Sequence, residues 1–109
     1  MKWYLIDEIN KTELAAVKDY LKQHMLRSGL ENVLWLQLPD LHYNVLQKTH
    51  TECAPFYIAV ELGNEWIRYE LFVRSMNTMG CECCSFCTHS QTEWVITEAE
   101  KMFSDLKIF

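Results

Sequence analysis

The sequence predicts an α+β fold: a single two-layer domain over residues 1–109, with a three- to four-stranded sheet and helices packed on one face. The length of 109 residues is typical of one domain. Half of the residues are apolar, with only 3 Gly and 2 Pro, which excludes a disordered or linker-rich chain. Two amphipathic helical patterns flank a β-hairpin pattern over about residues 55–74. We therefore expect one shared core.

The N-terminal third predicts a strand followed by a helix. Lys2–Ile6 is a short aromatic and branched segment that we interpret as a strand. Asn10 and Glu13 have the spacing of a capping box, and Gly29 offers a C-terminal stop. Apolar residues recur between them at helical spacing: Leu14, Val17, Leu21 and Met25.

The segment Val33–Leu38 is rich in strand formers and predicts a central strand. Pro39 ends it, because proline fixes φ and lacks a backbone donor. Asp40 can then cap a short helix that carries Leu41 and Val45 and fades in the polar residues that follow.

The hairpin is the clearest structural pattern. Phe56–Leu62 and Glu65–Arg74 alternate with period two around Gly63-Asn64, a pair that suits a two-residue type II′ turn. This turn pairs Leu62 with Glu65 and places Cys53 opposite Arg74. The remaining inward pairs are all apolar: Val60 with Ile67, Ile58 with Tyr69 and Phe56 with Leu71.

A second helix is predicted at the C-terminal end. Ser90 and Glu93 have the spacing of a capping box. An apolar stripe follows them: Val95, Ala99, Met102 and Leu106. We expect this helix to cover the inner face of the hairpin.

Cysteine is the residue whose distribution points to chemistry. Four of the 5 cysteines lie between Cys81 and Cys87, as a C-x-C pair followed by a C-x-x-C pair. The N-terminal segment lacks the long apolar region of a signal peptide, so we expect a cytoplasmic protein with reduced thiols. Metal binding or redox chemistry is then favoured over structural disulfides.

A second pair of candidate ligands lies before the hairpin, where His50 and Cys53 stand three residues apart. The hairpin brings Cys53 to its open end, from which the chain leaves toward Cys81. We expect a tetrahedral metal site made of His50, Cys53, Cys81 and Cys83. Zinc suits this mixed set, while an iron–sulfur cluster or copper(I) is an alternative for the same soft ligands. Further alternative or exchanging ligands follow: Cys84, Cys87 and His89.

The string from Met79 to Cys84 reads M-x-C-x-x-C and resembles the copper-binding loop of heavy-metal-associated domains. The resemblance implies copper(I) binding by Cys81 and Cys84. The surroundings depart from that family, in which the loop follows the first strand, whereas only 25 residues follow Cys84 here.

The leading hypothesis is a small cytosolic metal-binding domain, with structural zinc, that serves as an accessory or interaction module and not as an enzyme. Glycine-rich phosphate loops, the G-x-S-x-G elbow and the H-E-x-x-H helix are absent from the sequence. The alternative is a thiol-based redox or sulfur-handling protein that uses Cys84 and Cys87.

Charge and hydropathy limit the classes of partner. The formal net charge of −5 provides no cationic field for nucleic acid, and no apolar run approaches the ~20 residues that a membrane span needs. Trp66 and Phe72 fall on the outer face of the predicted hairpin, where we expect contact with a protein partner.

Overall fold

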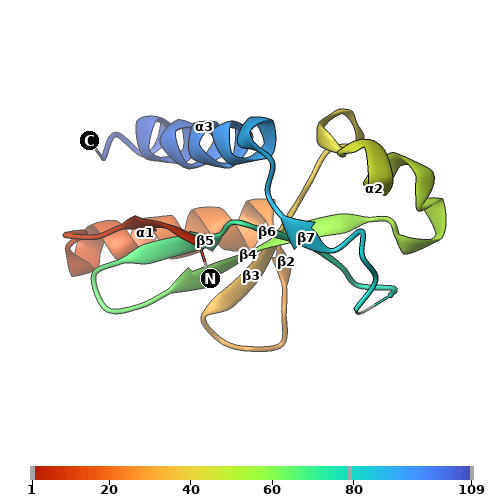
Figure 1. Ribbon diagram of the computed structural model, residues 1–109. Coiled ribbons are helices and arrows are strands. Elements are labelled where there is room, and N and C mark those ends of the chain that lie inside the picture. The colour runs from red at the N-terminus through yellow and green to blue at the C-terminus, as the bar shows by residue number, and fades with distance from the viewer. Residues whose placement is uncertain (1, 79, 109) are drawn as a thin grey trace.

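Helices and strands alternate along the chain in the structure, a computed structural model that describes residues 2–78 and 80–108 (Figure 1). The helical elements are α1 (Lys11–His24), η1 (Asp40–His42), α2 (Val45–Thr49), η2 (Thr51–Cys53) and α3 (His89–Asp105), of which η1 and η2 are 3-10 turns. The strands are β1 (Trp3–Ile6), β2 (Leu26–Arg27), β3 (Val33–Gln37), β4 (Phe56–Leu62), β5 (Ile67–Glu70), β6 (Phe72–Ser75) and β7 (Ser85–Phe86). The predicted α+β composition is confirmed.

The sheet is larger than predicted. Over the described residues it has seven antiparallel strands in the order β1-β5-β4-β3-β2, with β6 pairing both β4 and β7. The expectation of three to four strands was wrong because β2 and β7 have two residues each, too few to show a period-two pattern. β2 exists because α1 ends at His24 and not at Gly29.

The hairpin register differs from the prediction by two residues where β4 pairs with β5 and by four where β4 pairs with β6. Leu62 pairs with Ile67, so the loop covers residues 63–66 and is not the predicted two-residue turn. Trp66 folds back over Gly63: a Cβ built at Gly63 would lie 1.9 Å from Trp66 Cε2. Because side chains alternate with period two, a shift of two keeps each one on its predicted face. The inner-face side chains of β4 and β5 are therefore buried as expected: Phe56, Ile58, Val60, Ile67 and Tyr69.

An interruption at Leu71 divides the second hairpin strand into β5 and β6. Val60 pairs with Tyr69, while Tyr57 pairs with Arg74. Between these two pairs, the strand that contains β5 and β6 therefore has two more residues than β4. The amide of Leu71 donates to the carbonyl of Lys2 at 2.9 Å, and its carbonyl accepts from the amide of Cys87 at 3.0 Å. β1 therefore pairs with β5, and β7 pairs with β6. Both β5 and β6 pair with the same edge of β4.

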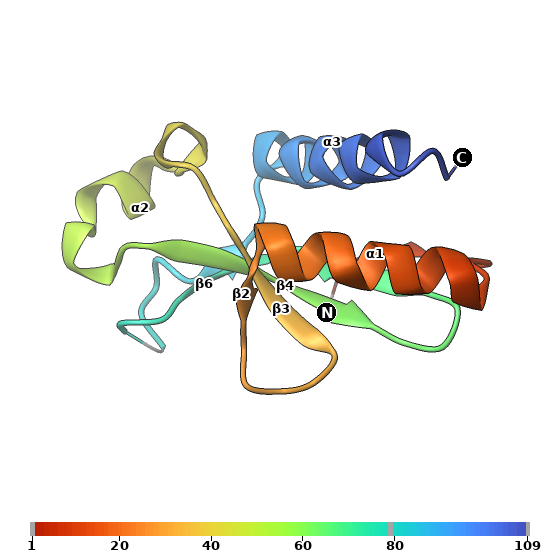
Figure 2. The ribbon, with the colours of Figure 1, turned by 180° about the vertical axis from the view of Figure 1, so that it is seen from behind.

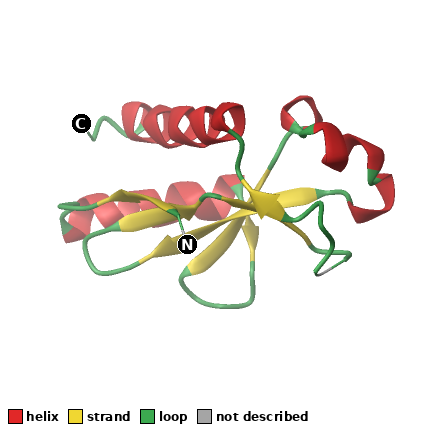
Figure 3. Cartoon of the chain, in the orientation of Figure 1, coloured by secondary structure: helices red, strands yellow, loops and turns green. Residues whose placement is uncertain are grey.

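The helices lie only partly on one face, which corrects the prediction of a single helical layer. α1 and α3 lie side by side along the sheet (Figures 1 and 2). α2 lies at the other end of the molecule, near the segment between β6 and β7 (Figure 3). That end contains the candidate ligands. Among the described residues, no helix combines the length and the apolar composition that crossing a membrane requires.

Each α-helix begins at a capping box. The predicted box of Asn10 and Glu13 is confirmed for α1. The box of α3 consists of Thr88 and Gln91 and not of Ser90 and Glu93, as predicted. Asn44, and not Asp40, caps α2.

Thr88→Ala should lower the free energy of unfolding by about 1 kcal/mol, because the Thr88 hydroxyl accepts the Gln91 amide at 3.1 Å. Ser90→Ala, in the exposed first turn of α3, should change it by less than about 0.5 kcal/mol. Urea unfolding of both variants measures the difference. Equal losses in the two variants would contradict the observed start of α3.

Candidate metal centre

One imidazole and three thiols meet where β4 begins and β6 ends. His50 is the C-cap residue of α2, Cys53 is the last residue of η2, and both Cys81 and Cys83 lie between β6 and β7. One ligand atom from each residue lies within 4.8 Å of every other. We call this group the cysteine–histidine cluster. It contains the four residues that the sequence suggested, and it could hold a metal ion.

The spacing of the cluster is close to that of a tetrahedral zinc site. Zinc–sulfur bonds of about 2.3 Å and zinc–nitrogen bonds of about 2.0 Å place the ligand atoms about 3.5–3.8 Å apart. His50 Nδ1 already lies 3.2 Å from Cys81 Sγ. Small side-chain movements would thus suffice to close four ligands around one ion.

The cluster has a buried side and an accessible side. Cys53 and Cys83 are 1% and 0% exposed, whereas His50 and Cys81 are half-buried. Local backbone bonds hold both segments: the Cys53 amide donates to the His50 carbonyl at 3.0 Å, and the Cys84 amide donates to the Cys81 carbonyl at 2.9 Å. The ligands therefore come from two tight turns.

The thiols of the cluster differ in acidity. Hydrogen bonds from the backbone and then the side chain of Cys83, with smaller contributions from His50 and Cys53, lower the pKa of Cys81 to about 7. Burial, followed by hydrogen bonding to Cys81 and Cys53, raises the pKa of Cys83. At neutral pH a thiolate is thus available on the accessible side, while the buried Cys83 keeps its proton.

Two buried glutamines connect the cluster to the helices. The Gln47 amide donates to the Cys83 carbonyl at 3.1 Å, and the Gln91 amide donates to Gln47 Oε1 at 2.9 Å and to the His42 carbonyl at 2.9 Å. Both glutamines are 1% exposed, and each also completes the capping box of its own helix. The position of Cys83 is thereby coupled to the starts of α2 and α3.

The remaining candidate ligands lie outside the cluster. Cys84 Sγ accepts the Ser75 amide at 3.3 Å, and exposed His89 pairs with Glu93 at 2.9 Å. Burial, and next the charge of Glu70, raises the pKa of Cys87 to about 11. The copper-loop resemblance pairs Cys81 with Cys84, whereas the cluster pairs Cys81 with Cys83; Met79 of that motif lies outside the described residues.

Convergence of the ligands did not depend on the predicted register. Cys53 was expected opposite Arg74, but the Ser75 hydroxyl donates to the Cys53 carbonyl instead. Sequence reasoning missed Gln47, Gln91 and Ser75. The two glutamines could have been found from their spacing after Asn44 and Thr88, which is that of a capping box.

Comparison with protein-family models, with curated proteins and with solved structures gave no match. The function is therefore argued from the geometry of the cluster.

The aromatic residues predicted to contact a partner have neighbours within the chain. The Arg68 guanidinium lies 3.9 Å from the Trp3 ring centre and 5.2 Å from that of Trp66. Phe72 packs edge-on against Phe86 with ring centres 5.4 Å apart. A protein partner at Trp66 and Phe72 stays a prediction.

Gln47→Leu should lower the free energy of unfolding by about 2–3 kcal/mol, because the Cys83 carbonyl and one Gln91 donor would lose their buried partner. Gln23→Leu, on an exposed position of α1, is the matched control and should cost less than about 0.5 kcal/mol. Thermal unfolding of both variants measures the difference. A Gln47→Leu variant as stable as the control would show that the amide chain contributes little.

Proposed function

We propose that the cysteine–histidine cluster binds one zinc ion and that this ion stabilises the fold. The observation that carries the proposal is the approach of four ligand atoms, from segments about thirty residues apart, to within 4.8 Å of one another. Buried cysteines alone can act as small apolar side chains. An imidazole nitrogen at 3.2 Å from one of three clustered thiols has no such explanation.

Zinc fits these ligands better than the other soft metals. Three thiolates and one imidazole form one of the common ligand sets of structural zinc sites. Iron–sulfur clusters of the common types use four thiolates, or two histidines in Rieske centres, so a three-thiol, one-imidazole set matches neither. Copper(I) favours thiolates and thioethers, and nothing in its preference requires His50.

A structural role follows from what holds the α2 end of the molecule. Leu41 in η1 and Val45 in α2 are 76% and 83% exposed, and the buried residue described in α2 is the polar Gln47. Leu46 of α2 packs against the core but is only partly buried, so a metal ion would add to limited apolar packing at α2 and η2. Four protein ligands would fill the coordination shell of zinc and leave no position for a substrate, as in structural sites.

The cellular role that agrees with these features is an accessory or interaction module in the cytoplasm. Reduced thiols persist in that compartment, and zinc binding requires them. The face with Trp66 and Phe72 is the proposed contact for a protein partner, since aromatic residues next to arginine are frequent at interfaces.

The redox alternative gains no support from Cys87, one of the two thiols that it would use. An attacking thiol needs a low pKa, and the pKa of Cys87 is raised to about 11. We therefore do not adopt a redox cycle between Cys84 and Cys87.

Removal of zinc should destabilise the fold. At free zinc about a thousandfold above Kd, binding contributes about 4 kcal/mol. Chelation should then lower Tm by roughly 15–30 °C for a domain of this size. Cys53→Ser should reproduce this loss and become insensitive to chelator. Cys87→Ser is the matched control and should keep the response to chelator, because Cys87 lies outside the cluster. A wild-type Tm that chelation leaves unchanged would contradict the structural role.

Zinc affinity should fall as the pH is lowered, because protons compete with zinc for the thiolates. The raised pKa of Cys83 means that zinc displaces its proton throughout the neutral range. The pKa of Cys81 is about 7, so this thiol is mostly protonated only below pH 7, where zinc must displace its proton as well. The slope of log K against pH should therefore steepen by about one as the pH falls through 7. Competition titrations at several pH values measure it, and a slope that flattens toward acid would contradict this ligand set.

A further inference from the structure

A cavity of about 570 Å³ adjoins the accessible side of the cysteine–histidine cluster. Its volume is in the range of small-molecule sites. Residues from three places in the fold line it, among them Trp35, Phe72, Arg74, Met76, Cys81 and Cys84. Cys81 belongs both to the cavity wall and to the cluster. The cavity therefore opens directly onto one proposed zinc ligand.

From the cavity, the cluster is reached at Cys81. Cys53 and Cys83 are closed off by burial, with 1% and 0% exposure. His50 and Cys81 are the half-buried ligands, and of these two Cys81 lies in the cavity wall. An ion bound to a carrier in the cavity therefore meets Cys81 before the two buried thiols.

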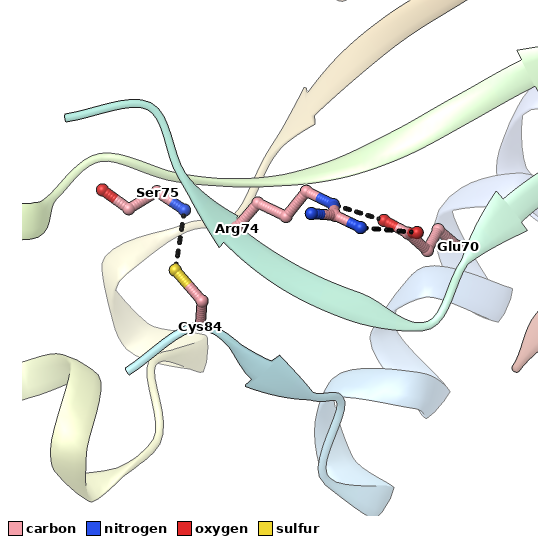
Figure 4. Close-up of polar contacts among 4 residues, drawn as sticks. All are labelled: Glu70, Arg74, Ser75 and Cys84. Atoms are coloured by element: carbon pink, nitrogen blue, oxygen red, sulfur yellow. Dashed lines mark hydrogen bonds and ion pairs between the residues drawn. The ribbon is translucent and has the colours of Figure 1, made fainter. Parts of the chain in front are cut away.

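Cys84 gives the cavity wall a second thiol. Its sulfur accepts the Ser75 amide at 3.3 Å, and its thiol contacts the Thr78 carbonyl at 3.8 Å. Figure 4 shows the Cys84 side chain pointing toward the backbone of β6 at Ser75. The cation nearby is fixed as well, since Arg74 donates to Glu70 at 2.7 and 2.9 Å (Figure 4). Cys84 is thus a positioned thiol beside the cluster and outside it.

We propose that Cys84 is a transfer ligand through which zinc passes between a small-molecule complex in the cavity and the cysteine–histidine cluster. This inference rests on the proposed function. It changes the role of the site from a permanently closed one to one that can exchange its ion with small carriers.

The transfer is a ligand exchange without electron transfer. A zinc–sulfur bond to Cys84 forms as a bond from zinc to the carrier breaks, and the Cys84 proton passes to solvent or to the released donor atom of the carrier. The bond to Cys84 then breaks as zinc binds the buried thiols, whose protons also leave. Cys84 finally regains a proton from solvent. Cys81 can stay bound to zinc throughout, because it lines the cavity and also belongs to the cluster.

Stopped-flow transfer of zinc from the coloured chelator 4-(2-pyridylazo)resorcinol to the full-length protein tests this role, with and without a small thiol. Cys84→Ser should keep the equilibrium affinity within about twofold while slowing both loading and removal by about tenfold, as when a transition state loses one contact. Cys87→Ser is the matched control and should exchange at the wild-type rate, since Cys87 is not among the residues that line the cavity.

Wild-type rates in Cys84→Ser would overturn the proposal. A Cys84→Ser variant that loses affinity as severely as Cys53→Ser would overturn it too, because Cys84 would then be a resident ligand. Wild-type protein that takes up no zinc at all would instead contradict the proposed function, on which the transfer role depends. Circular dichroism of each variant before mixing verifies that the compared proteins are folded.

Discussion

The arrangement of this protein depends on how two turns, one with His50 and Cys53 and one with Cys81 and Cys83, are held together at one end of the sheet. α1 and α3 pack along the sheet mainly through buried apolar side chains, whereas the buried residue described in α2 is an amide, Gln47. At this end, sulfur, imidazole and amide groups add to the apolar contacts of partly buried residues such as Leu46. Polar groups remain buried only when they are partnered, and among the described residues no buried side-chain nitrogen or oxygen atom lacks a hydrogen-bond partner. The three thiols and the imidazole of the cluster are the groups at this end that could share a metal ion.

The interruption at Leu71 has a functional consequence. It lets one edge of β4 pair with β5 at one end and with β6 at the other, and it gives β7 a neighbour. The segment between β6 and β7 therefore returns past the start of β4, where Cys53 lies. Hydrogen bonds connect the thiol-bearing turn to the two capping-box glutamines, and the interruption at Leu71 binds the backbone of Cys87 at the end of the same segment.

Patterns of residue spacing allowed part of this structure to be predicted. The capping box at Asn10, the strand at Val33 and the buried face of the hairpin follow from period and local chemistry. The four cluster residues could be named because the register error, which is four residues where β4 pairs with β6, still left Cys53 at the same end of the hairpin. The two-residue strands, the Leu71 interruption and the Trp66 ring over Gly63 depend on tertiary contacts. No local pattern predicts them.

The central claim is that zinc occupies the cysteine–histidine cluster with three sulfur ligands and one nitrogen ligand. X-ray absorption at the zinc edge, on protein purified without added metal, tests this claim most directly. The account predicts one zinc per chain with three sulfur neighbours at about 2.3 Å and one nitrogen neighbour at about 2.0 Å. Zinc below a tenth of an equivalent, or a shell made only of oxygen and nitrogen, would contradict it.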